Sequence, residues 1–176
     1  MITYKQASTI NQLEQILALQ QQNLPKNLSA KEKEQEGFLT VEHSLGSLKE
    51  MNDECPHIIA LEHGKVVGYA LCMHPKFASL IEVLKPMFHE INRLTQNNCN
   101  YMVMGQICVS KEYRGKGVFR GLYSTMKEKL PKGFDTIITE VDAKNKRSLH
   151  AHSAVGFIEL KRYSSKGKEW SLTLLT

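Results

Sequence analysis

The spacing of apolar residues along this chain predicts strands and helices in alternation. Short runs that are continuously or alternately apolar are typical of strands, and apolar residues that recur every three or four positions are typical of amphipathic helices. The clearest helical pattern is formed by Val118, Leu122, Met126 and Leu130, which recur at every fourth position. Strands are expected at 2–6, 57–62, 65–73, 101–110, 136–142, 157–163 and 168–175. Helices are expected at 9–22, 31–52, 77–94, 117–130 and 146–155.

Glycine and proline divide several of these elements. His63 and Gly64 separate two strand patterns and predict a β-hairpin between them. The second helix can break near Gly37 or Gly46, because glycine weakens a helix interior. The third helix is expected to tolerate Pro86 as a kink or a break.

Length and composition favour one folded domain, 1–176, with a core of its own. No apolar run is long enough to span a membrane, and the first residues do not resemble a signal peptide. The four cysteines lack the spacing of metal ligands, so we expect reduced thiols in a cytoplasmic protein that binds neither a metal nor a membrane. These cysteines are Cys55, Cys72, Cys99 and Cys108.

Charge is unevenly distributed along the chain. From Tyr101 onward 14 Lys and Arg stand against 7 Asp and Glu, whereas the first hundred residues have 9 against 11. A basic half suits a polyanionic ligand, and nucleic acid is one such ligand. The sequence has no basic run of five or more and no interleaving of basic and aromatic residues. We therefore expect no nucleic-acid partner.

A glycine-containing turn joins the strand at 101–110 to the helix at 117–130. Gly115 and Gly117 let backbone N–H groups converge, and the helix start adds further unpaired donors and the positive end of its dipole. Arg114, Lys116 and Arg120 bracket the same turn. This arrangement suits a phosphorylated ligand, with an ordinary tight turn as the alternative.

Two familiar phosphate-binding motifs fit this turn poorly. A Walker A loop is excluded, because no Gly-Lys-Ser/Thr closes it. A dinucleotide fingerprint is partly matched by Gly115, Gly117 and Gly121, with Glu140 about twenty residues further on. A polar turn separates the strand from the first glycine, however, and the chain is too short for a two-halved nucleotide fold. An NADPH-dependent oxidoreductase is therefore a distant alternative.

Two segments of the chain resemble the signatures of the Gcn5-related N-acetyltransferases (GNAT). The run from Arg114 to Phe119 resembles the Gln/Arg-x-x-Gly-x-Gly/Ala pyrophosphate loop of that family. The run from Asn145 to Phe157 resembles its second signature, an Asn that opens a helix with Gly-Phe at the helix end. Phe119 departs from the small residue that usually ends the loop, and His152 stands where the family often has tyrosine.

The resemblance extends over the whole chain and implies an α/β (α+β) fold. The sheet would be mixed, with about seven strands splayed between the fourth and the fifth and helices on its faces. It also implies acetyl-CoA as co-substrate, an amine of a small molecule or peptide as acceptor, and direct attack in a ternary complex. The alternative is a non-catalytic module that binds or senses acyl-CoA. A monomer and a homodimer are both compatible with the sequence.

The cofactor-binding residues follow from the matched positions of the two signatures. Backbone groups of the fourth strand would pair with the pantetheine arm and stabilise an oxyanion, and the loop would hold the pyrophosphate. The alternative for the strand positions is simple burial, and for Asn145 simple helix capping. The implied residues are Ile107, Cys108, Val109, Arg114, Gly115, Lys116, Gly117, Val118, Phe119, Arg120, Asn145 and Ser148.

Catalytic candidates are fewer. Helical spacing turns His152 inward, where it could protonate the departing thiolate or could simply be a satisfied core histidine. Glu140 and Asp142 share one strand face and could accept the proton of the amine, through water. Gln106 and Cys108 could orient an acceptor, and Cys108 as a nucleophile is a minority alternative.

The acceptor is the least determined part of the reaction. The segment 32–54 has many carboxylates, and the early helices of the resembled fold border the acceptor groove, so we expect a cationic amine. These carboxylates are Glu32, Glu34, Glu36, Glu42, Glu50, Asp53 and Glu54.

Overall fold

The computed structural model describes residues 1–32, 39, 41–96 and 99–176. Its centre is a seven-stranded mixed sheet with the order β1-β2-β3-β4-β5-β7-β6. This confirms the α/β architecture. The strands are β1 (Thr3–Gln6), β2 (Ile58–Glu62), β3 (Lys65–Met73), β4 (Tyr101–Val109), β5 (Thr136–Asp142), β6 (Ile158–Ser165) and β7 (Lys168–Leu175).

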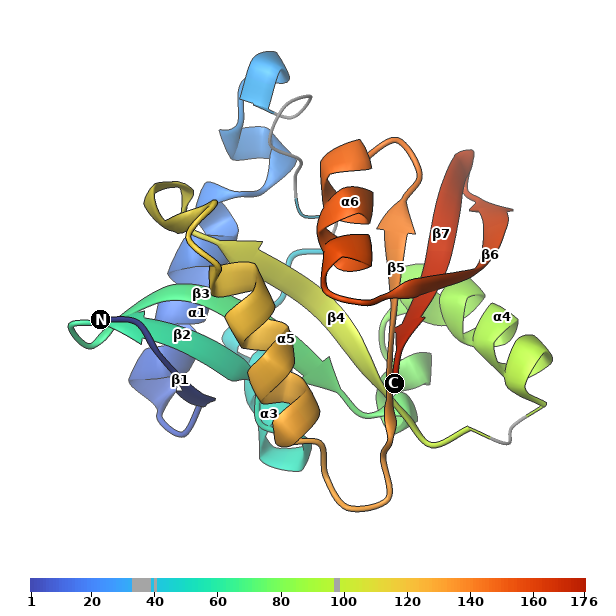
Figure 1. Ribbon diagram of the computed structural model, residues 1–176, viewed down its shortest axis with the longest axis horizontal. Helices are drawn as coiled ribbons and strands as arrows, with labels where there is room; N and C mark the ends of the chain where they lie inside the picture. The colour runs from blue at the N-terminus through green and yellow to red at the C-terminus, as the bar shows by residue number, and fades with distance from the viewer. Residues whose placement is uncertain (33–38, 40, 97–98) are drawn as a thin grey trace.

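Helices cover both faces of the sheet (Figure 1). Apolar side chains of α1, α3 and α4 form one core with one face, and those of α5 form a second core with the other face, together with Phe157 just after α6. The α-helices are α1 (Ile10–Gln22), α3 (Leu45–Glu54), α4 (Lys85–Thr95), α5 (Val118–Glu128) and α6 (Lys146–Ala154). Short 3-10 helices are η1 (Pro25–Asn27), η2 (Pro75–Ser79), η3 (Glu82–Leu84) and η4 (Lys111–Tyr113).

The sheet opens between β4 and β5, as expected. These two strands are parallel and pair through only three positions, from Tyr101 with Thr136 to Val103 with Ile138. Beyond Val103 they diverge (Figure 1). The register of β4 against β3 also shifts there, leaving Gly105 as an extra residue in a β-bulge. The divergence leaves backbone of β4 facing a gap.

The expected second helix is helical at residues 31 and 32 and again from Leu45, but among the described residues in between it is wrong. Residues 41–44 are not helical, and α3 begins only after Ser44, whose side chain forms a capping box with Ser47. Buried hydrogen bonds also hold this segment against its neighbours, since Val41 accepts from Gln106. The possible break at Gly37 lies outside the described residues.

The expected third helix is also wrong in its first half. Two 3-10 helices, η2 and η3, occupy residues that the apolar spacing assigned to one long helix. Pro86 lies in the first turn of α4, where its missing N–H costs nothing, and therefore begins a helix instead of kinking one. Within the described residues, no helix is long and apolar enough to cross a membrane.

Candidate active site

Two adjoining cavities lie at the gap between β4 and β5. The first cavity, of about 400 Å³, lies among the end of β4, the loop before α5, and α6. The second cavity, of about 590 Å³, is bordered by β4, β5, β7 and the start of α6. Leu39, Ile107, Asn145 and Ser148 line both cavities. A ligand lying in the first cavity can therefore extend one end into the second.

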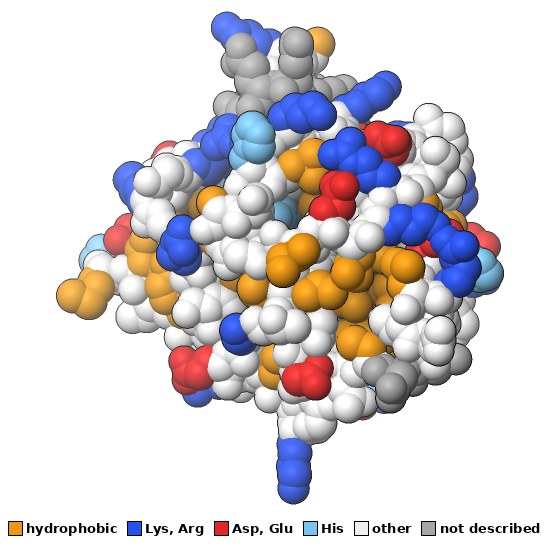
Figure 2. All heavy atoms as spheres, turned by 45° about the vertical axis from the view of Figure 1, so that its right-hand side comes forward, with side chains coloured by type: hydrophobic (Ala, Val, Ile, Leu, Met, Phe, Trp, Pro, Cys, Tyr) orange, Lys and Arg blue, Asp and Glu red, His pale blue; other side chains and the backbone are white. Residues whose placement is uncertain are grey.

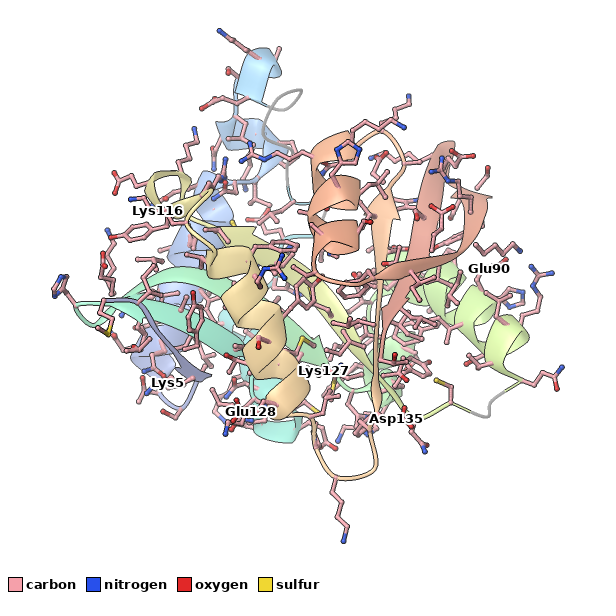
Figure 3. All side chains as sticks on the ribbon, viewed as in Figure 1. Lys5, Glu90, Lys116, Lys127, Glu128 and Asp135 are labelled. Atoms are coloured by element: carbon pink, nitrogen blue, oxygen red, sulfur yellow. The ribbon has the colours of Figure 1, made fainter. Side chains whose placement is uncertain are left out.

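The residues expected to bind a cofactor gather at the first cavity. All of them line it except Lys116, whose ammonium lies 5.3 Å from the Tyr113 ring centroid on the loop before α5 (Figure 3). Figure 2 shows Lys and Arg side chains gathered over the upper part of one face of the molecule.

The loop before α5 adopts the left-handed backbone that glycine permits. Gly115 has φ +73° and Gly117 has φ +80°, and within the part of the chain that the structure describes no heavy atom beyond the adjacent residues lies within 4 Å of a Cβ built on either glycine. Backbone conformation, not crowding, therefore accounts for both glycines. Gly117 is the N-cap of α5, and the first helical bond runs from Gly121 N to Gly117 O at 3.0 Å. The amides of residues 118–120 precede this bond and, as at any helix N-terminus, have no acceptor within the helix.

Two arginines of this loop region fasten neighbouring elements. Arg114 donates through Nε to Val109 O at 3.0 Å and through a terminal nitrogen to Asn23 Oδ1 at 2.9 Å. Arg120 donates to Ala154 O at 2.9 Å, which links α5 to the end of α6. These bonds fix the walls of the first cavity and place two cationic groups beside it.

The backbone of β4 alternates between β3 and the gap. Ser110 N donates to Val67 O at 2.9 Å, so in an antiparallel ladder the backbone of Cys108 also faces β3. The backbone groups of Ile107 and Val109 therefore face the gap. Burial raises the pKa of the Cys108 thiol to about 12, which keeps it protonated at neutral pH and counts against a nucleophilic role.

The start of α6 lies across the gap from these strand residues. Asn145 is the N-cap, and its Oδ1 accepts from Ser148 N at 3.0 Å, so its capping role is confirmed. A contact between Asn145 and the pantetheine arm stays a prediction. Ser148 lies at the junction of the two cavities, one turn into the helix.

His152 belongs to a buried aromatic cluster. Its Nδ1 is 2.7 Å from Ser148 O and must donate to that carbonyl, so Nε2 accepts from the Tyr123 hydroxyl at 2.8 Å. Burial lowers the pKa of His152 to about 4, and the ring is neutral at pH 7. Phe119 packs edge-on against both His152 and Tyr123 at 5.1 Å. These contacts fit a satisfied core histidine, and the proton-donor role of His152 stays a prediction.

The structure distinguishes the two candidate bases, which both line the second cavity. Burial raises the pKa of Glu140 to about 7, partly opposed by a hydrogen bond from the Tyr163 hydroxyl. Asp142 instead accepts from Lys144 N at 2.9 Å and lies 3.9 Å from Lys168 Nζ. Glu140 therefore has the proton affinity that suits a base at neutral pH.

Gln106 joins a buried network that the sequence did not reveal. Its Oε1 accepts from the Tyr69 hydroxyl at 2.7 Å and from Gln20 Nε2 at 3.1 Å, and its Nε2 donates to Val41 O at 2.7 Å. Gln20 Oε1 in turn accepts from His43 N at 2.9 Å. The network holds the extended segment before α3 beside the second cavity. A polar residue on the apolar face of the first helix was the only sequence signal for it.

The carboxylates expected to attract a cationic acceptor lie elsewhere. Of those that the structure describes, none lines either cavity, and four pair with lysines on the surface. Glu34 and Glu36 lie outside the described residues. The pairs are Glu32 with Lys111, Glu42 with Lys26, Asp53 with Lys49, and Glu54 with Lys76.

The fold is similar to those of several solved acetyltransferases. The ribosomal-protein-S18-alanine N-acetyltransferase from Escherichia coli matches with a TM-score of 0.65 and 16% identity, over 99% of this chain and 93% of that chain. A chain of the NatC complex bound to Gag peptide and CoA has a TM-score of 0.66 and 19% identity, over 99% and 97%. The structure of yncA from Salmonella typhimurium, solved with its cofactor acetyl-CoA, has a TM-score of 0.65 and 14% identity, over 99% and 93%.

Sequence identities as low as these establish similarity of fold alone. A search of curated protein sequences gave no match. The family comes from a sequence model. The model described as the acetyltransferase (GNAT) family matches residues 13–157, which are most of the chain. The chain therefore belongs to the GNAT acetyltransferase family.

Proposed function

We propose that this protein is an acetyl-CoA-dependent N-acetyltransferase. It transfers the acetyl group to an amine of a small molecule or peptide by direct attack in a ternary complex. The observation that carries the proposal is the meeting of two cavities at the gap between β4 and β5. One cavity accommodates a phosphorylated thioester, the other an acceptor, and the reacting atoms meet at Ile107 and Ser148. The acetyl-CoA and CoA bound in two structures of this fold support the choice of donor.

The first cavity fits coenzyme A chemically. The open left-handed turn at Gly115 and Gly117 lets a diphosphate approach the backbone, and the amides of residues 118–120 donate to it. The N–H groups of Ile107 and Val109 face the gap and are placed to hydrogen-bond the pantetheine arm and the thioester carbonyl. Bound acetyl-CoA supplies the activated acyl group. The protein orients it and stabilises charge that develops on its carbonyl oxygen.

Glu140 takes the proton of the amine, directly or through one water. A base is most effective when its pKa lies near the working pH, and the pKa of Glu140 is about 7. His152 remains the proposed donor to the departing thiolate because it lines the second cavity. A neutral imidazole cannot protonate a thiolate, so the ring can act only after it takes up the proton that the amine nitrogen loses on attack, and Nδ1 must then exchange its bond to Ser148 O for one to the sulfur.

One observation favours the alternative of a non-catalytic acyl-CoA-binding module. Both ring nitrogens of His152 are already hydrogen-bonded within the core, so an acid is not ready at the thioester. Calorimetry with acetyl-CoA and a thiol-release assay with a panel of amines separate the two functions. Binding with turnover supports the enzyme, and binding without turnover on any amine supports the module.

Three further features are proposed on the sequence alone. They are one domain spanning 1–176, a cytoplasmic location, and a monomeric or homodimeric state. The four cysteines are free thiols in the structure, as the expectation of reduced cysteines requires. Size-exclusion chromatography with light scattering decides the oligomeric state.

A further inference from the structure

A tyrosine behind the second cavity contacts the proposed base. Tyr163 lies on β6, the outermost strand of the sheet, and its hydroxyl donates a hydrogen bond to Oε2 of Glu140 on β5. Because β7 lies between these strands, the bond reaches across two inter-strand spacings, about 10 Å. Only long side chains on the same face of the sheet can meet over that distance.

A β-bulge places Tyr163 on that face. The register of β6 against β7 shifts at Leu160, which is an extra residue in β6. A slip of one residue reverses the faces of all side chains beyond it. With the bulge, Tyr163 pairs with Trp170 and shares the face of Glu140. Without it, Arg162 would pair with Trp170 on that face, and its positive charge would favour the ionised form of Glu140.

Charged groups on the neighbouring strands and on α4 are engaged in pairs of their own. Lys161, on the same face of β6, lies 2.8 Å from Glu90 of α4, which Figure 3 shows beside β6 and β7. Asp142, two residues beyond Glu140, lies 3.9 Å from Lys168 on β7. Arg93 also lies 2.9 Å from Glu90, so the Glu90 cluster carries one net positive charge, whereas the pair of Asp142 and Lys168 carries none. Neither pair is among the resolved causes of the pKa shift of Glu140.

Three further titratable residues, Glu169, His152 and Lys144, line the second cavity. Glu169 lies 3.4 Å from Arg162 on the adjacent strand, and His152 is neutral within its aromatic cluster. Lys144 is exposed at the rim. Among the described residues, the hydroxyl of Tyr163 is thus the group with a direct hydrogen bond to the Glu140 carboxylate.

We propose that Tyr163 is a positioning residue for the transfer reaction, which fixes the Glu140 carboxylate and sets the pH range in which the enzyme works. This rests on the proposed function, in which Glu140 accepts the amine proton. A hydrogen bond donated to a carboxylate favours its ionised form, whereas burial favours the protonated form. Loss of the hydroxyl therefore raises the pKa of Glu140 further and leaves less of the active, ionised base at pH 7.

The test is Tyr163→Phe, which keeps the ring and removes the hydroxyl. We expect the acid limb of the kcat/KM profile to move up by about one pH unit, the effect of one hydrogen bond to a charged group. Activity at pH 6.5 should then fall by up to about tenfold, with a high-pH plateau within about twofold of wild type. Carbon NMR of labelled glutamate carboxyls, with Glu140→Gln to assign the resonance, should show the same upward shift of the Glu140 titration.

Tyr101→Phe is the matched control, because Tyr101 belongs to the core against which Tyr163 packs and lines neither cavity. It should change neither the NMR titration nor the pH profile. An unmoved Glu140 titration in Tyr163→Phe overturns the proposal, and so does a moved titration with an unmoved kcat/KM profile. If wild type transfers acetyl to no amine while the titration still moves, the proposed function fails. The hydrogen bond would then stand without a catalytic role.

Discussion

Replacing the proposed base should make the protein more stable while it removes activity. The Glu140 carboxyl has its pKa raised from 4.5 to about 7, because burial disfavours its ionised form. A group whose pKa is higher in the folded state contributes its stability below the unfolded pKa and loses it as the pH rises through the folded one. Ionised Glu140 therefore weakens the fold above pH 7 and has no such effect near pH 4.

The magnitude follows from the size of the shift. A rise of about 2.5 pH units corresponds to about 3 kcal/mol of destabilisation at pH 8. Glu140→Gln keeps the shape and cannot ionise, so it should recover a large part of that free energy. For a chain of this length, that gain raises Tm by roughly 6–12 °C at pH 8, and the gain should shrink to near zero at pH 4.

Thermal unfolding of both proteins from pH 4 to pH 8 measures this difference, and transfer assays on the same samples measure the loss of activity. Glu128→Gln is the matched control, since Glu128 is an exposed carboxylate at the end of α5 (Figure 3). It should change the free energy of unfolding by less than about 1 kcal/mol at any pH. Parallel curves of Tm against pH for wild type and Glu140→Gln would refute the proposed state of this carboxyl.

Two further substitutions test the supports of the site. Gln106→Leu leaves Val41 O and two buried donors without their partner. This should lower the free energy of unfolding by about 1–3 kcal/mol for each group and raise KM for the acceptor. An unchanged urea midpoint would contradict the network. His152→Phe should lower Tm by breaking the bonds to Ser148 and Tyr123, and an unchanged Tm would contradict those contacts. If His152→Phe also lowers kcat tenfold while Kd for acetyl-CoA is unchanged, His152 has the proton-donor role.

The local pattern of apolar residues predicted the strands of the sheet well, because the alternation or run of apolar residues in a strand involves only neighbours in the sequence. The strands at 65–73, 136–142 and 168–175 have the expected bounds. The helix expected over 31–52 is interrupted at 41–44, where a capping box at Ser44 and a hydrogen bond to Val41 hold the chain outside a helix. Of the kink and the break expected at Pro86, the structure has the break, and the proline lies in the first turn of the helix that follows because it is tolerated there.

The site was predictable where it depends on backbone and unpredictable where it depends on distant pairing. Glycines after a strand and an Asn before a helix indicated the first cavity directly. The contact of Tyr163 with Glu140 depends on the register of a bulge at Leu160, and no residue type at that position signals a bulge. The engagement of Gln106 with Gln20 joins residues far apart in the chain, which local periodicity does not report.

Two substitutions of opposite charge at Gly117 test most directly whether the loop before α5 binds a diphosphate. Gly117→Glu and Gly117→Lys impose the same backbone strain and similar bulk on the N-cap of α5. Only the glutamate repels a diphosphate, and one pair of like charges about 5 Å apart at an effective dielectric constant of about 20 costs about 3 kcal/mol. We predict that calorimetry finds a Kd for acetyl-CoA at least a hundredfold weaker for Gly117→Glu than for Gly117→Lys. Equal affinities in the two variants would show that the diphosphate binds elsewhere.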